Sequence, residues 1–267
     1  MENKHQLKQD FSELTVDVVD VAIGLLSDNE LLKDVPVAGM IYKLGKAVSS
    51  IPDAIFLQKV GKFLQTVNEK TTVDQRISFA EDVRRDKDKR EKLYSAIFLK
   101  IDKFDDISKP DLFAKIFACF ITNKIREEDF TALASALNHA TVENLKFFSN
   151  SYWKEKGYQF RDAYASLNGD YGSLLSTNLV AINLNQKLNT THGRLPSLLY
   201  SLSFKVTELG CLYAFISEDF EDYFAFVDET QRGYAKILSY GRKYAFKSTL
   251  PDDEFAKKIQ QKFPLKR

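Results

Sequence analysis

The chain has 267 residues, of which 44% are hydrophobic and 28% are charged, and this composition is typical of a globular protein rather than a disordered or fibrous one. Lys and Arg total 38 against 37 acidic residues, so the net charge is too small to attract a polyanion to the chain as a whole. Any polyanionic partner must be held by a local patch.

The N-terminal part carries repeated helix-start signals. Four pairs have the spacing of a capping residue and its reciprocal partner, in which a side chain accepts a backbone N–H: Asp10 with Glu13, Ser27 with Glu30, Ser50 with Asp53, and Thr72 with Gln75. Between residues 51 and 67, apolar residues recur at three- and four-residue spacing. This pattern predicts a helix with one broad apolar face that must pack against another element.

Residues 35–64 form the first candidate surface. This segment contains Lys43, Lys46, Lys59 and Lys62 but only one acid, Asp53. Basic amphipathic helices can lie on an anionic membrane, where each lysine contributes about 1 kcal/mol. The simpler interpretation is a helical hairpin that packs on the protein's own core.

Residues 81–123 predict an exposed helix followed by a buried one. Charges of both signs between Glu81 and Lys92 are spaced for pairing along a solvated helix face. Ser108, Pro110 and Asp111 signal the start of a helix that runs to about Asn123. That helix is apolar almost all round, which predicts a central position. Two more helices are expected at residues 129–139 and 141–152.

The apolar period then changes from helical spacing to two. Val180, Ile182 and Leu184 alternate with polar residues, and a second alternating run spans residues 198–206. A turn-rich stretch at 189–194 separates the runs, so the sequence predicts a β-hairpin. Thr207 and Glu208 then open another helix.

This order of helices, two-stranded wing and helix resembles a winged-helix domain over residues 129–216. The resemblance implies either DNA binding through the helix before the wing or protein contacts alone. The corresponding stretch, residues 171–179, contains no Arg or Lys. Because affinity for duplex DNA depends largely on cations that meet phosphates, this departure argues against DNA binding.

The C-terminal tail, residues 231–267, forms the second candidate surface. It holds ten Lys or Arg residues against three acids. Cations and aromatic rings alternate at Tyr240, Arg242, Lys243, Tyr244 and Lys247, a combination that suits single-stranded nucleic acid. An acidic block at residues 218–229 precedes the tail, so neutralisation within the fold or across a dimer is an equal alternative.

We expect no catalytic, cofactor-binding or metal-binding residues and no small-molecule site. The two cysteines, Cys119 and Cys211, lie in apolar settings and are expected to be reduced and buried. With three scattered histidines they do not provide zinc-ligand spacing. The sequence contains neither a P-loop nor a Gly-x-Ser-x-Gly elbow. Neither a signal peptide nor a spanning apolar run of 18 residues is evident.

The sequence therefore predicts a mainly α protein. It has a multi-helix region at 1–125, a winged-helix-like unit with one β-hairpin at 126–216, and an acidic-then-basic tail at 217–267. The leading hypothesis is a non-enzymatic cytoplasmic protein that binds a protein partner or itself. One alternative is an effector of the bacterial toxin or defence type, peripheral to an anionic membrane through residues 35–64. The other is a nucleic-acid-binding protein that uses residues 231–267.

Overall fold

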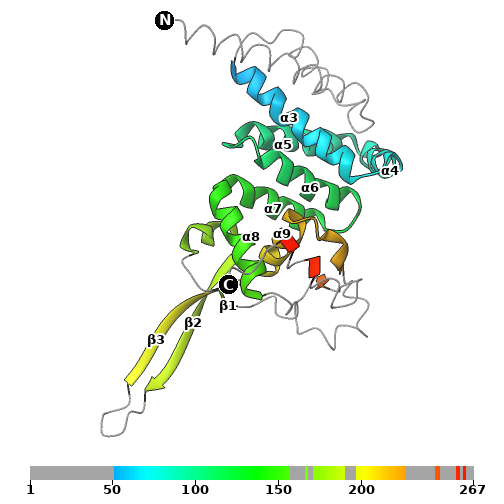
Figure 1. Cartoon of the computed structure of the whole chain (residues 1–267). Coiled ribbons are helices and arrows are strands. Elements are labelled where there is room, and N and C mark those ends of the chain that lie inside the picture. Colours follow the sequence, from blue (N-terminus) through cyan, green and yellow to red (C-terminus); the bar gives the residue numbers. More distant parts are fainter. Residues whose placement is uncertain are drawn as a thin grey trace, which may run out of the picture. The chain divides into compact units, whose positions relative to one another are not determined.

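The structure is a computed structural model that describes residues 51–156, 166–167, 171–189, 197–226, 244–246, 257–258 and 261–262. The chain divides into two compact units, Met1–Asn123 and Lys124–Arg267. In its described part the first unit is helical, and the second combines helices with two small sheets (Figure 1). The predicted mainly α fold with a β-hairpin is confirmed.

Four helices make up the described part of the first unit. They are α3 (Ile51–Lys70), α4 (Val73–Arg84), α5 (Lys87–Lys103) and α6 (Lys109–Ile121). Helix α3 packs on α5 and α6, and α4 packs on the same two helices. The apolar face predicted on residues 51–67 thus closes on other helices of its own unit.

Capping chemistry fixes the start of α4. The Thr72 side chain accepts a hydrogen bond from the Gln75 backbone at 3.3 Å, and the Gln75 side chain accepts one from the Thr72 backbone at 2.9 Å. The continuous helix expected over residues 81–92 is wrong, however, because the chain leaves helical geometry between Arg84 and Lys87. The break lets α4 and α5 pack on one another, and Arg85 pairs with Asp82 at 3.2 Å.

Aromatic side chains fill the core of the first unit. The ring of Phe63 lies 5.4 Å from that of Phe113 and 5.5 Å from that of Phe117. Phe104 completes the cluster, 5.6 Å from Phe113. Because Phe113 and Phe117 belong to α6, the prediction of a buried, almost wholly apolar helix is confirmed.

The second unit contains helices α7 (Glu127–His139), α8 (Val142–Lys156) and α9 (Glu208–Ser217). Helix α9 packs on both others. The only tryptophan, Trp153, is 2% exposed and donates a hydrogen bond from Nε1 to the Ala214 carbonyl at 3.2 Å. Its ring lies 5.0 Å from those of Phe215 and Phe220, so α8 and α9 share one aromatic core.

The larger sheet is built on the hairpin. Strands β2 (Val180–Asn189) and β3 (Ser197–Val206) pair antiparallel over ten positions, and the short β1 (Ser166–Leu167) pairs with the base of β3. Strands β4 (Phe224–Phe226) and β5 (Tyr244–Phe246) form a second sheet that the sequence did not predict.

A short 3-10 helix, η1 (Gly172–Thr177), stands where the resemblance placed the helix before the wing. Asn178 ends it in the left-handed conformation, with φ of 59°, which asparagine tolerates better than most residues. One more 3-10 turn, η2 (Glu221–Tyr223), follows α9. No described helix is long and apolar enough to cross a membrane.

A close approach fixes the base of the hairpin against α9. Thr207 caps α9 by accepting a hydrogen bond from the Gly210 backbone at 3.0 Å, and the Thr207 backbone donates to the Leu179 carbonyl at 3.1 Å. A Cβ atom at position 210 would stand 2.1 Å from that same carbonyl oxygen. Only glycine permits this approach.

Candidate functional site

The strongest candidate is one face of the β2–β3 hairpin. In an antiparallel ladder, directly paired residues share a face and successive pairs alternate between faces. The register therefore places the pairs Val180–Val206, Ile182–Phe204 and Leu184–Leu202 on one face. The intervening pairs, including Asn183–Ser203, belong to the opposite face.

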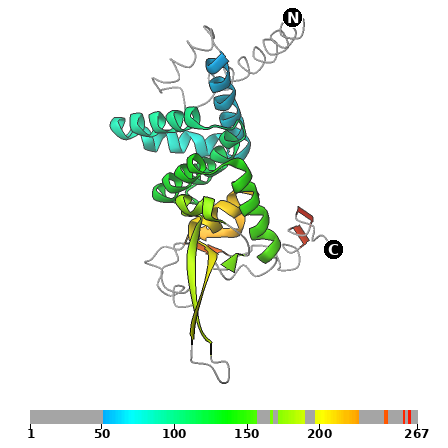
Figure 2. The same ribbon diagram turned by 90° about the vertical axis from the view of Figure 1, so that its left-hand side faces the viewer.

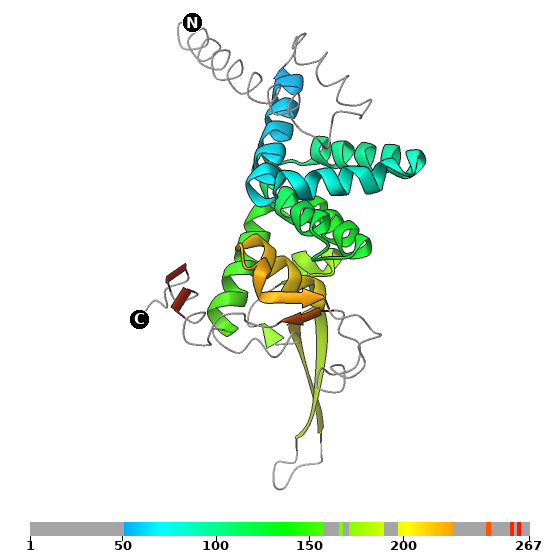
Figure 3. The ribbon, with the colours of Figure 1, turned by 90° about the vertical axis from the view of Figure 1, so that its right-hand side faces the viewer.

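Burial along this apolar face changes abruptly. At the base, Val180 is 3% exposed and Val206 is fully buried, whereas Ile182 and Leu184 are 51% and 59% exposed. The hairpin projects beyond the helices of its own unit, as two views from opposite sides show (Figures 2 and 3). The same face thus belongs to the core at one end and meets solvent further out.

Aromatic residues connect the exposed part to the body of the unit. The ring of Tyr171, which is buried, lies 5.9 Å from Phe204 and stacks at 5.2 Å on Phe147 of α8. Phe147 is itself 49% exposed. We call Phe147, Ile182, Leu184 and Phe204 the apolar strip. Ring contacts through Tyr171 connect its α8 member, Phe147, to Phe204 on the hairpin.

The face that carries the strip has no charged residue along the ladder. Beyond Leu184 the register adds the pairs Gln186–Tyr200 and Leu188–Leu198 to it. The lysines of the hairpin, Lys187 and Lys205, belong to pairs of the opposite face. By register, the uncharged face thus lies opposite a face that carries both lysines of the hairpin.

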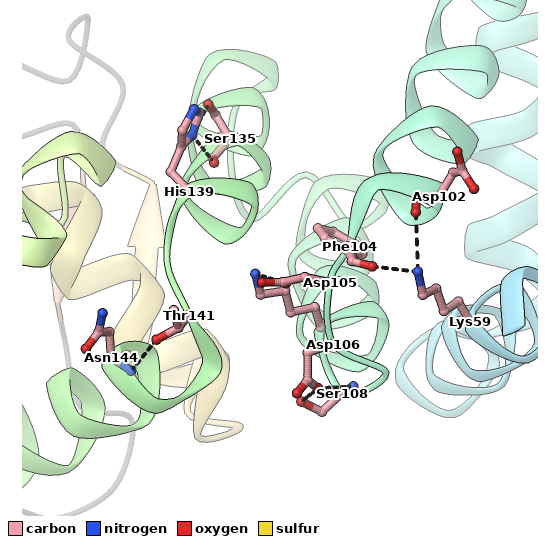
Figure 4. A network of polar contacts seen from close by, with 11 residues as sticks. Lys59, Asp102, Phe104, Asp105, Asp106, Ser108, Ser135, His139, Thr141 and Asn144 are labelled. Carbon is pink, nitrogen blue, oxygen red and sulfur yellow. Dashed lines mark hydrogen bonds and ion pairs between the residues drawn. The ribbon is translucent and has the colours of Figure 1, made fainter. Parts of the chain in front are cut away.

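The candidate lysines of residues 35–64 have different environments. Lys59 is 9% exposed and donates hydrogen bonds from Nζ to the carbonyls of Phe104 at 2.5 Å and Asp102 at 3.3 Å (Figure 4). These carbonyls lie at the C-terminal end of α5, so Lys59 caps that helix. Lys62 is exposed. Lys43 and Lys46 lie outside the described residues.

The candidate residues of the tail are only partly described. Tyr244 lies in β5, opposite Phe226 of β4. Tyr240, Arg242, Lys243 and Lys247 lie outside the described residues. Elsewhere in the tail, Lys262 pairs with the Glu218 carboxylate at 3.0 Å. Lys262 of the tail is thus paired with Glu218 of the acidic block. This contact is of the kind expected if the tail and the acidic block neutralise one another within the fold.

Several titratable or nucleophilic groups that the structure describes make contacts within the fold. Both cysteines are free and buried, as predicted. Burial raises the pKa of the Tyr152 and Tyr213 phenols above the usual value, which keeps them neutral in the core. The exposed His139 bonds through Nδ1 to the Ser135 carbonyl at 2.8 Å, one helical turn away (Figure 4). Among the described residues, no cluster of His, Cys, Asp or Glu has the arrangement of a metal site.

An ion pair closes the turn before α6. Lys109 is 1% exposed and pairs with the Asp105 carboxylate, four residues earlier. The hydrogen bond from Lys109 lowers the pKa of that carboxyl below its usual value. Asp106, beside it, accepts hydrogen bonds from the Ser108 hydroxyl at 2.6 Å and the Ser108 backbone at 2.7 Å (Figure 4). This polar cluster holds the α5–α6 connection.

Comparison of the chain with protein families, with curated proteins and with solved structures finds no match. The winged-helix resemblance stays a prediction. Sequence reasoning identified the hairpin but not its apolar face as a candidate site. The alternation of residues 180–184 and 198–206 contained the signal for this face. Alternate apolar positions of a strand share one face, and an apolar face is normally buried against another surface.

Proposed function

We propose that this chain is a non-enzymatic protein that acts by binding a protein partner through the apolar strip. The observation that supports the proposal is the change in burial along one hairpin face, from the buried pair Val180–Val206 to the exposed Ile182 and Leu184. Neighbouring exposed apolar residues on a projecting element, bordered by polar residues, are typical of a protein-interaction site.

The energetics favour a cover over this face. Burial of apolar surface stabilises by about 25 cal/mol per Å², so a large aliphatic side chain gains about 1.5–3 kcal/mol from full burial. Ile182 and Leu184 are slightly more than half exposed, so each would gain roughly half of that amount, about 1 kcal/mol, on complex formation. Residues that contribute at this level near the centre of an interface have measurable effects on affinity.

A pair of matched variants tests the proposal. Ile182→Thr with Leu184→Thr places hydroxyls on the apolar face and uses threonine, a β-branched residue suited to a strand. Ala181→Thr with Asn183→Thr introduces the same two threonines at neighbouring positions on the opposite face. Both variants and the native chain serve as bait in extracts of the native host, with crosslinking and quantitative mass spectrometry.

We expect Ile182→Thr with Leu184→Thr to capture at least tenfold less of the specific partner protein than the native chain. Ala181→Thr with Asn183→Thr should capture as much as the native chain. Circular dichroism of each bait checks that the fold is kept. Equal capture by all three proteins would show that the apolar strip is not the binding surface and would remove the proposal.

A further inference from the structure

We infer that the C-terminal segment around Lys262 is a strap over the end of α9, closed in this structure and opened when the charge of Lys262 is neutralised or screened. We call residues 257–258 and 261–262, which have helical backbone, the strap. The inference concerns a conformational switch in the second unit and does not depend on the apolar strip.

The end of α9 favours a cation. Asp219 follows the C-cap residue Glu218 in the left-handed conformation, with φ of 64°. The backbone N–H groups of Asp219 and Phe220 donate to the carbonyls of Ile216 at 3.2 Å and Phe215 at 2.8 Å. This closure is a Schellman motif, and it satisfies two carbonyls of the last turn. The Glu218 carbonyl follows them at the negative end of the helix dipole, where a positive charge is stabilised.

Lys262 makes three contacts at this helix end. Its Nζ donates a hydrogen bond to the Glu218 carbonyl at 2.6 Å and pairs with the Glu218 carboxylate at 3.0 Å. The same Nζ lies 5.3 Å from the centroid of the Phe220 ring. Hydrogen bonds from an ammonium, ion pairs and cation–π contacts all draw strength from the positive charge. Loss of that charge therefore weakens the three contacts together.

Helix α8 holds the receiving site in place. The buried Ser149 donates a hydrogen bond from Oγ to Oε1 of Glu218 at 2.8 Å, which leaves Oε2 to pair with Lys262. Phe220 is 6% exposed, and its ring lies 5.0 Å from that of Trp153. The carboxylate and the ring are thus fixed by contacts with α8. The receiving site can keep its shape when the strap leaves.

The strap is held at the surface of the unit. All four of its described residues are exposed, and the Lys262 side chain itself is 41% exposed. Segments that bury little of their own surface open at a lower free energy than the core to which they attach. The charge contacts of Lys262 therefore have a large share in keeping the strap closed. Opening uncovers one side of the Phe220 ring and frees the Glu218 carboxylate.

Hydrogen exchange of the full chain, followed by mass spectrometry, tests this inference. Lys262→Gln keeps a polar side chain but removes the charge, and it should raise the exchange rate of the peptide that contains residues 257–262 about tenfold. Lys262→Arg keeps the charge and the cation–π contact, so its rate should stay within about twofold of the native rate. Lys257→Gln, at an exposed position of the same segment, is the matched control and should exchange like the native chain.

Salt and tryptophan quenching provide two independent readouts. An increase from about 0.05 to about 1 M NaCl shortens the screening length to about 3 Å, so the native strap should exchange faster while Lys262→Gln should hardly respond. Trp153 is the only tryptophan and packs on Phe220. Acrylamide, which is uncharged, should therefore quench its fluorescence more strongly in Lys262→Gln than in Lys257→Gln.

Three results would overturn the inference. Equal exchange of the strap peptide in the native chain and in Lys262→Gln would show that the lysine does not hold the segment. Equal acceleration in peptides of α8 and α9 would show that Lys262 stabilises the whole unit and closes no separate strap. Exchange in Lys262→Arg as fast as in Lys262→Gln would show that the positive charge is not what keeps the segment closed.

Discussion

Replacement of Lys59 by methionine separates its two possible roles, a membrane contact and a helix cap. Methionine keeps the length and apolar stem of the side chain but removes the three N–H donors. The carbonyls of Phe104 and Asp102 then lose the donor that lies 2.5 Å and 3.3 Å away. Lys62→Met, one turn further along α3 on an exposed side chain, is the matched control.

The expected cost follows from these contacts. A hydrogen bond to a charged group contributes about 1.5–3 kcal/mol, and a cation at a helix C-terminus adds about 0.3–1 kcal/mol. The contact with Asp102 is long, and loss of the ammonium also removes the cost of its burial. Together these effects give a net loss of about 2 kcal/mol for Lys59→Met. The exposed Lys62→Met should stay within about 0.5 kcal/mol of the native chain.

Urea unfolding followed by far-UV circular dichroism measures the difference. At a slope of about 2 kcal/mol per molar urea, the transition of Lys59→Met should shift down by about 1 M. Flotation with anionic liposomes provides the second readout. Unchanged stability of Lys59→Met, combined with reduced flotation relative to Lys62→Met, would refute the assignment of Lys59 as a cap and support a lipid contact.

Two further predictions concern the second unit. Gly210→Ala places a Cβ atom 2.1 Å from the Leu179 carbonyl oxygen, so the backbone must move. Thermal unfolding should show that the free energy of unfolding decreases by about 2–3 kcal/mol. A native-like melting temperature would contradict the close approach. Tyr213→Phe tests alkaline unfolding. The buried phenol keeps a raised pKa, so the folded chain retains a proton that the unfolded chain releases above about pH 10. The free energy of unfolding is independent of this phenol below that pH. Above it, the free energy of unfolding decreases by up to about 1.4 kcal/mol per pH unit for each such tyrosine. The free energy of unfolding of Tyr213→Phe should decrease less steeply than that of the native chain between pH 10 and 11.5. Parallel curves for the two proteins would exclude this contribution from Tyr213.

Local signals in the sequence predicted the parts of the fold that depend on neighbouring residues. The capping pair Thr72–Gln75 opens α4, and Thr207 opens α9 through Gly210. The two-residue period of residues 180–184 and 198–206 predicted the hairpin and the residues that share each face. The caps and the two-residue period can each be seen within a window of a few residues, which is why the sequence alone predicts them.

Features that depend on distant contacts could not be predicted in this way. The donor Lys59 and its acceptor Phe104 are 45 residues apart, so the pattern of basic residues on α3 gave no indication of a cap. The break between Arg84 and Lys87 carries neither Gly nor Pro and reflects the packing of α4 on α5. Strands β4 and β5 are three residues each, too short to show a period.

The length of the hairpin connects the fold to the proposed function. Anchoring to the body needs only its base, where Val180 and Val206 are buried and Thr207 leads into α9. The ladder nevertheless continues through Asn189–Ser197, and beyond the base Ile182 and Leu184 remain exposed on the apolar face. A ribbon that served only as a connection would favour polar residues on both faces once it left the core, because exposed apolar surface promotes aggregation. The exposed Ile182 and Leu184 beyond the base are therefore the reason to propose that this surface is covered by a partner.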